Sequence, residues 1–122
     1  MIIEFSWGTG KLSVDAKILI VDMPMADFKK WVKLFARYGE PADHKAFLQL
    51  LDAFSANVKE DAEPMEAELA EFQAKAEGRI FSQLTPEYCQ TQVKRIQRHL
   101  NGINRTLKRY QTMHDLLKGL VS

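Results

Sequence analysis

Alternation of apolar and polar residues at the start of the chain predicts two β-strands. In residues 2–7 the apolar side chains Ile3, Phe5 and Trp7 share one face, and residues 11–20 repeat the alternation. The segment GTGK between them supplies glycines, which tolerate the positive φ of a tight turn. The alternation is lost in the run ILIV at residues 18–21, which indicates a strand end covered on both faces. We therefore expect a β-hairpin over residues 1–21.

Residues 24–58 change to the helical period, with apolar residues three and four positions apart. Pro24 suits a first helical turn, Gly39 is expected to end the first helix, and Pro41 allows a second helix to start. The apolar stripes of the two helices are Phe28, Trp31, Val32 and Phe35, and then Phe47, Leu50, Leu51, Phe54 and Val58. Such aromatic stripes are typical of a core, so we predict a helical pair rather than a ligand platform.

Residues 64–120 predict a longer antiparallel helical hairpin. The acidic segment KEDAE at residues 59–63 is expected to be a connector, after which Pro64 starts a third helix over residues 65–83. Thr85 and Pro86 indicate the start of a fourth helix, and Gly119 is expected just past its end. The fourth helix carries a heptad seam of Cys89, Val93, Ile96, Leu100, Ile103, Leu107, Tyr110, His114, Leu117 and Val121. The seam favours lengthwise packing on the third helix.

Together these segments predict an α+β, mainly helical fold. An N-terminal β-hairpin is followed by about four helices, of which the last two form an antiparallel pair with a long heptad-patterned C-terminal helix. A length of 122 residues suits a single domain over residues 1–122. The lone Cys89 cannot form an intramolecular disulfide, and neither a membrane-spanning run nor a signal-peptide pattern is visible. These features favour a cytoplasmic protein that has no membrane partner.

The formal net charge of +1 conceals a segregation of charge along the chain. Residues 1–39 carry six basic and four acidic side chains, residues 40–78 three and ten, and residues 79–122 eight and two. On the fourth helix Lys94, Arg98, Arg105 and Arg109 fall within about 60° of one another on a helical wheel, and Lys108 flanks them. This basic stripe lies opposite the seam, so it faces water or a partner.

The basic stripe has more than one interpretation. A linear cationic track is what binding to nucleic-acid phosphates requires. The near-neutral chain, and the lack of aromatic residues between the cations, argue against that use. An antiparallel third helix would bring Glu66, Glu68 and Glu71 within reach of the flank of the stripe and weaken its field. We favour a solvated or compensated face, and we keep nucleic acid and an acidic protein partner as alternatives.

No pattern in the sequence predicts a catalytic, cofactor or metal site. The segment GTGK lacks the glycine that a phosphate-binding loop places six positions before its lysine, where Phe5 stands instead. His44, His99 and His114 lie far apart, and His114 occupies a seam position that suits a packed histidine. Cys89 on the seam is interpreted as a small core residue. We therefore expect no enzyme activity, no cofactor, no metal and no small-molecule substrate.

The function that we expect is that of a small non-enzymatic binding protein acting through protein–protein contact, as an inhibitor, adaptor or assembly subunit. The hairpin edge offers one surface for a partner or for a second copy in a homodimer. The end of the fourth helix offers another, because its apolar arc widens there. Its predicted partner-binding residues are Tyr110, Met113, Leu116 and Leu120. The alternative function is nucleic-acid binding, with phosphate contacts from Lys94, Arg98, Arg105, Lys108 and Arg109.

Overall fold

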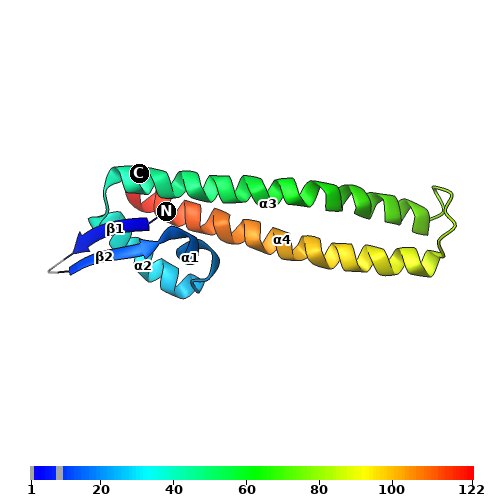
Figure 1. Cartoon of the computed structure of the whole chain (residues 1–122), viewed down its shortest axis with the longest axis horizontal. Coiled ribbons are helices and arrows are strands. Elements are labelled where there is room, and N and C mark those ends of the chain that lie inside the picture. Colours follow the sequence, from blue (N-terminus) through cyan, green and yellow to red (C-terminus); the bar gives the residue numbers. More distant parts are fainter. Residues whose placement is uncertain (1, 8–9) are drawn as a thin grey trace. The chain divides into compact units, whose positions relative to one another are not determined.

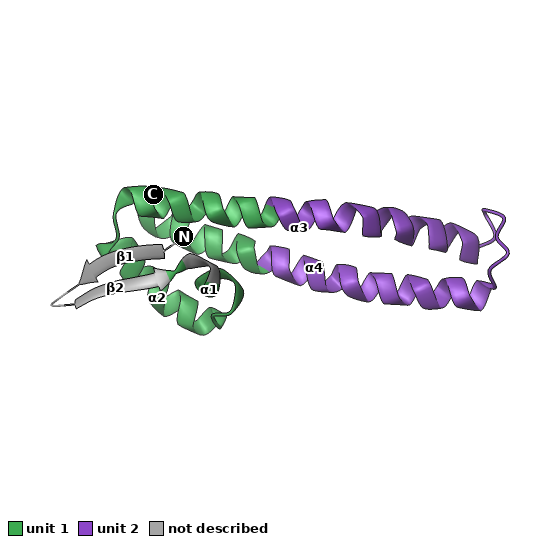
Figure 2. Cartoon of the chain, viewed as in Figure 1, with its two compact units in different colours: residues 1–55, 109–122 green, residues 56–108 purple. Residues whose placement is uncertain are grey.

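The computed structural model describes the backbone of residues 2–7 and 10–122, and the side chains of residue 15 and residues 18–122. In this part of the chain the elements are β1 (Ile2–Trp7), β2 (Gly10–Asp15), α1 (Ala16–Val21), α2 (Met25–Tyr38), α3 (Pro41–Ala76) and α4 (Pro86–Val121) (Figure 1). The chain divides into two compact units (Figure 2). Unit 1 comprises residues 1–55 and 109–122, and unit 2 comprises residues 56–108. The predicted single domain stays a prediction, because compact units can belong to one folding domain.

The N-terminal segment differs from the prediction. β1 and β2 pair antiparallel, from Ile2 opposite Asp15 to Trp7 opposite Gly10. The chain then leaves the strand, and the residues predicted to continue it form α1. Residues 8 and 9 of the predicted turn, and the side chains on the predicted strand faces, lie outside the described part. The α+β class with a β-hairpin over residues 1–21 is therefore wrong, because residues 16–21 are helical and four helices, rather than a sheet, make up the fold. The mainly helical character was part of the prediction and agrees with the structure.

The physical reason for this correction lies in the apolar run of residues 18–21. A continuous apolar run has no period, so it fits a strand covered on both faces as well as a buried helical turn. In α1, Leu19 and Ile20 are fully buried, whereas Ile18 and Val21 are exposed. Two adjacent buried residues between two exposed ones match the one-sided burial of a helix, and a strand would have alternated.

The core of unit 1 gathers around α2. The predicted stripe Phe28, Trp31, Val32 and Phe35 is buried, which confirms this amphipathic helix. The Phe47 ring of α3 lies 6.3 Å from that of Phe28, 5.7 Å from that of Trp31 and 5.8 Å from that of Phe35. Gly39 ends α2 as predicted, and its N–H donates to the Phe35 carbonyl at 2.8 Å. A Cβ atom at Gly39 would lie 2.6 Å from that oxygen, so the close approach requires glycine.

α3 is one long helix where two helices were predicted. The predicted connector at residues 59–63 is helical, and Pro64 lies inside the helix instead of starting one. The residues of KEDAE are helix formers apart from one aspartate, so nothing before Pro64 breaks the helix. The helix ends at Ala76, short of the predicted end at residue 83. Gly78 has a φ of +75° there, and the Arg79 N–H donates to the Ala74 carbonyl at 2.9 Å, which is a common way to close a helix.

α4 starts where the sequence predicted. The Tyr88 N–H donates to Thr85 Oγ1 at 3.1 Å, which confirms the predicted helix cap. Gly119 lies inside α4, so the predicted end before it is wrong. Within unit 2, α3 and α4 pack antiparallel, as the heptad spacing predicted (Figure 1). The core of this unit consists of Ala62, Ile96 and Leu100, against which Met65, Leu69, Phe72 and Ile103 pack while partly buried.

Candidate functional site

The predicted partner-binding residues at the end of α4 separate into buried and accessible ones. Tyr110 is 8% exposed, with its ring 6.1 Å from that of Phe54, and Met113 is 0% exposed. Both belong to the core of unit 1, so they present no surface to a partner. Leu116 is half-buried, and Leu120 is 47% exposed. Only these two of the four predicted residues can take part in contact.

Leu116 and Leu120 line a surface groove of about 480 Å³ in unit 1. One wall comes from α2, through Lys29, Val32 and Lys33, and the other comes from the last turns of α4. Val32 is 1% exposed and forms an apolar base, whereas both lysines are exposed. Among the described residues no carboxylate pairs with Lys29 or Lys33. The remaining lining residues are Asp115 and Gly119.

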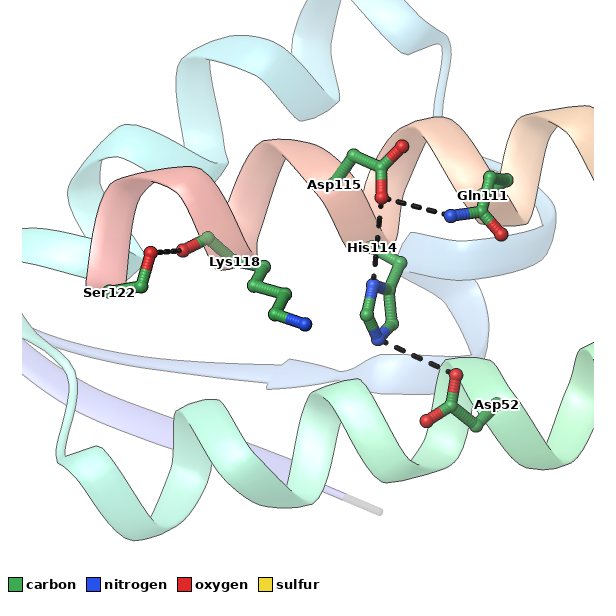
Figure 3. A network of polar contacts seen from close by, with 6 residues as sticks. All are labelled: Asp52, Gln111, His114, Asp115, Lys118 and Ser122. Carbon is green, nitrogen blue, oxygen red and sulfur yellow. Dashed lines mark hydrogen bonds and ion pairs between the residues drawn. The ribbon is translucent and has the colours of Figure 1, made fainter.

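A network of polar contacts includes Asp115, the one carboxylate among the described residues that line this groove (Figure 3). Asp115 Oδ1 accepts a hydrogen bond from Gln111 Nε2 at 2.9 Å and lies 3.8 Å from His114 Nδ1. The other ring nitrogen of His114, Nε2, lies 3.5 Å from Asp52 Oδ1 of α3. His114 is thus a packed seam residue between two carboxylates, in agreement with its predicted structural role. Asp115 keeps its negative charge, since a neutral amide is its hydrogen-bond donor, so the two lysines outweigh this one carboxylate and leave the lining of the groove with a positive charge.

A second surface, which the sequence prediction missed, is the loop between α3 and α4 in unit 2. Its large apolar side chains are exposed, and Phe81 reaches 89%. Together with Tyr88 in the first turn of α4, these residues form what we call the loop cluster: Ile80, Phe81, Leu84 and Tyr88. Ser82 Oγ accepts a hydrogen bond from the Leu84 N–H at 3.1 Å, which gives the loop a defined turn. Gly78 was the available signal, because a glycine at that position can end α3 and leave the following apolar residues outside the helix.

The residues predicted to contact nucleic acid also fall into two groups, four that are exposed in unit 2 and one that has a structural role in unit 1. Lys94, Arg98, Arg105 and Lys108 are exposed on α4 in unit 2. In the described part of the chain no ion pair joins Lys94, Arg98 or Arg105 to a carboxylate of α3. The Glu71 carboxylate pairs instead with Lys75 on its own helix at 2.9 Å. These three cations of the stripe are therefore open, so of the two forms that we favoured for this face, solvated or compensated, the structure has the solvated one.

Arg109, the fifth predicted phosphate contact, has a structural role in unit 1. Its Nε donates to the Ile20 carbonyl at 2.9 Å. Its Nη2 donates to the Leu19 carbonyl at 3.5 Å and, through a shorter hydrogen bond, to the Met23 carbonyl. The guanidinium thus satisfies carbonyl groups at the C-terminal end of α1, where a positive charge is favourable. It is not available to a phosphate.

The histidines and the cysteine that were considered for catalysis or metal binding lie apart from one another. His44 is buried, and its Nε2 lies 2.6 Å from the Phe35 carbonyl oxygen, while His99 is exposed on α4. Cys89 is fully buried, in agreement with its interpretation as a core residue. The described residues contain no group of three or more histidines, cysteines or carboxylates that could hold a metal ion.

Comparisons with protein-family models, with curated proteins and with solved structures find no match to this chain. A membrane-spanning helix is not found either, since no helix in the described residues has the length and the apolar character to cross a bilayer.

Proposed function

We propose that this protein is a small non-enzymatic binding protein that acts through protein–protein contact. The observation that carries the proposal is the loop cluster, in which four large apolar side chains within nine consecutive positions are exposed. Apolar residues concentrated in this way commonly mark interaction sites. Full burial of one large apolar side chain contributes about 1.5–3 kcal/mol, so a partner that covered Phe81 would gain a central anchor.

The surroundings of the loop cluster suit a protein interface. Charged and polar side chains stand beside the apolar ones, among them Arg79, which pairs with Glu77 at 2.7 Å. An apolar centre inside a polar rim is the usual composition of a protein–protein contact. The Tyr88 ring rests edge-on against Phe72, with the centroids 6.5 Å apart, so part of the surface is already ordered before binding. A role as inhibitor, adaptor or assembly subunit is consistent with this surface.

The experiment is photo-crosslinking in living cells. The photoreactive residue p-benzoyl-phenylalanine replaces Phe81 in one variant and Gln90, an exposed residue on α4, in the other. We expect a defined crosslinked species from position 81 and none from position 90. The same species should be lost in a competition with free wild-type protein but not with the Phe81→Ser variant.

The mass of the crosslinked species identifies the partner as another protein or as a second copy of this chain. Equal crosslinking from positions 81 and 90 would contradict the proposal. Phe81→Ser must also leave the free energy of unfolding unchanged within about 0.5 kcal/mol, because a substitution of an exposed side chain away from special features has little effect on stability.

Nucleic-acid binding is a second candidate function, favoured by the open cations Lys94, Arg98 and Arg105. Under this candidate, the affinity for mixed-sequence DNA or RNA falls steeply as salt is added, because phosphate contacts release counterions. Fluorescence anisotropy at low salt tests it, with Arg98→Glu combined with Arg105→Glu as the variant that abolishes binding. No binding at low salt would eliminate this candidate.

We also propose that the protein acts in the cytoplasm. The support is its single cysteine, which is buried and unpaired, as is usual for proteins in a reducing compartment. Fractionation of cells that express the full chain tests this location.

A further inference from the structure

The groove of unit 1 carries an inference beyond the function proposed for the loop cluster. Its walls combine apolar side chains of α2 and α4 with two lysines of α2. We propose that this groove binds an acidic segment of a partner protein, with one bulky apolar side chain seated against Val32, Leu116 and Leu120. Carboxylates on either side of that anchor face Lys29 and Lys33. Nothing in this proposal depends on the loop cluster, whose residues belong to unit 2.

The apolar part of the groove suits a side chain better than a long lipid tail. Its volume of about 480 Å³ falls within the range of sites that enclose small ligands. The apolar lining is short, however, because among the described side chains only Val32, Leu116 and Leu120 contribute large apolar groups to it. A single aromatic or aliphatic side chain would cover this lining, whereas most of a long acyl chain would remain in water.

The charge of the groove determines which residues are favoured on either side of the apolar anchor of the ligand. Lys29 and Lys33 are four residues apart on α2, so they project from the same side of the helix. Neither has a carboxylate partner among the residues whose side chains the structure describes, and the Asp115 carboxylate on the opposite wall is hydrogen-bonded to Gln111 (Figure 3). An acidic segment therefore brings the countercharges that the two lysines lack, whereas a basic segment would be repelled.

Gly119 provides a way to block the groove without disturbing the fold. It lies in α4, and a Cβ atom added there would have no atom within 4 Å. A tryptophan at this position can therefore extend into the open space of the groove. Alanine at the same position adds only the Cβ atom, and it improves helix propensity in a comparable way. Gly119→Trp and Gly119→Ala thus form a matched pair, one of which fills the groove.

The test is fluorescence anisotropy with the full-length protein and three fluorescein-labelled peptides. The first peptide has a tryptophan flanked by glutamates and aspartates, the second has serine in place of the tryptophan, and the third has lysines in place of the acids. We expect the first to bind at least about tenfold more tightly than either of the others. Gly119→Trp should abolish that binding, whereas Gly119→Ala should leave it unchanged.

The charge arm of the test uses lysines of the same helix. Lys29→Glu combined with Lys33→Glu should weaken binding by about tenfold or more, because two attractions become repulsions. Lys30→Glu is the control, since Lys30 is exposed on α2 but does not line the groove. Circular dichroism must show that all variants remain folded.

Four outcomes would overturn the proposal. The first is equal binding of the acidic and basic peptides, and the second is wild-type binding by Gly119→Trp. The third is displacement of the peptide by octanoate with comparable affinity, which would assign the groove to a small anionic amphiphile. The fourth is a doubled mass in sedimentation that the acidic peptide reverses, which would assign the groove to a second copy of the chain. Crosslinking from Phe81 is measured separately, so failure here leaves the proposed function standing, and the reverse also holds.

Discussion

The two units differ in what their cores bury. Unit 1 encloses aromatic rings of α2 and α3, with fully buried side chains of α1 and α4 around them, among them Leu19, Met113 and Leu117. The buried apolar residues of unit 2 are fewer and mostly small: Ala62, Ala74, Cys89, Ile96 and Leu100. Because hydrophobic stabilisation is roughly proportional to the apolar area removed from water, unit 1 should hold most of the tertiary stability.

Unit 2 therefore depends more on local interactions than unit 1 does. Its large apolar side chains Met65, Leu69 and Phe72 are only partly buried, and its ion pairs Glu71–Lys75 and Glu77–Arg79 join residues close in sequence. Regions with few buried contacts open more easily than a large core. The loop cluster and the open cations both belong to unit 2. The unit with the smaller buried core therefore carries the exposed apolar loop cluster and the open cations, whereas unit 1 presents the groove.

The largest expected effect is a loss of core packing in unit 1. Phe47→Ala removes a fully buried ring that neighbours three other rings, and we expect a loss of about 4 kcal/mol in the free energy of unfolding. Leu100→Ala in unit 2 is the matched substitution, and we expect a loss of about 2 kcal/mol because its surroundings can collapse around the gap. Urea denaturation followed by circular dichroism measures both. A larger loss for Leu100→Ala would reverse the comparison.

The next effect concerns the Arg109 guanidinium. Arg109→Met keeps the aliphatic stem but leaves the carbonyls of Ile20 and Met23 without their charged donor, at an expected cost of about 2–3 kcal/mol. Arg105→Met, one turn earlier and exposed in unit 2, should change stability by less than about 0.5 kcal/mol. Hydrogen exchange should also show α1 losing protection in the Arg109 variant alone. Equal effects of the two variants would mean that Arg109 has no special role in unit 1.

How far the sequence could predict this protein depends on whether a segment has one preferred period. The stripe of α2 and the seam of α4 have clear helical spacing; the stripe is buried as predicted, and the seam is buried or partly buried except for Val121, which is exposed. The run at residues 18–21 has no period, so tertiary burial of Leu19 and Ile20 decided in favour of a helix. At Pro64 the start signal was misleading, because the helix-forming residues before it carry α3 through the proline.

The candidate site was predictable only in part for the same reason. Leu116 and Leu120 were correctly placed on an accessible apolar arc, but the spacing on α4 could not show that Tyr110 and Met113 are buried in the core of unit 1, where the Tyr110 ring lies beside that of Phe54 on α3. Arg109 has the wheel position of a phosphate contact, and only the fold brings α1 to it. The exposure of Phe81 depends on where α3 ends, and helix ends are the features that a sequence specifies least well.

A smaller effect would sharpen the account of unit 2. Pro64 is exposed inside α3 and lacks the N–H that would bond to the preceding turn. Pro64→Ala restores that hydrogen bond, and we expect a gain of about 1–2 kcal/mol in the stability of this unit, since the helix has already adapted to the proline. Native-state hydrogen exchange should show slower exchange in residues 56–76, with little change around α2. A loss of stability would indicate that the proline sets a necessary bend.

The smallest effect is the pH dependence of the Glu71–Lys75 pair, which is local to unit 2. The hydrogen bond to the Glu71 carboxylate, reinforced by its charge, raises the pKa of Lys75 above its ordinary value of 10.5. A raised pKa means that the contribution of the pair is complete below the ordinary value and is lost as the pH rises through the folded-state value. Glu71→Gln should therefore lower the free energy of unfolding slightly at neutral pH and have no effect well above pH 10.5. Thermal melts of the wild type and this variant at both pH values measure the difference. A difference that stays constant with pH would show that the effect of Glu71→Gln does not come from its ion pair with the Lys75 ammonium, because that pair is lost when Lys75 is deprotonated.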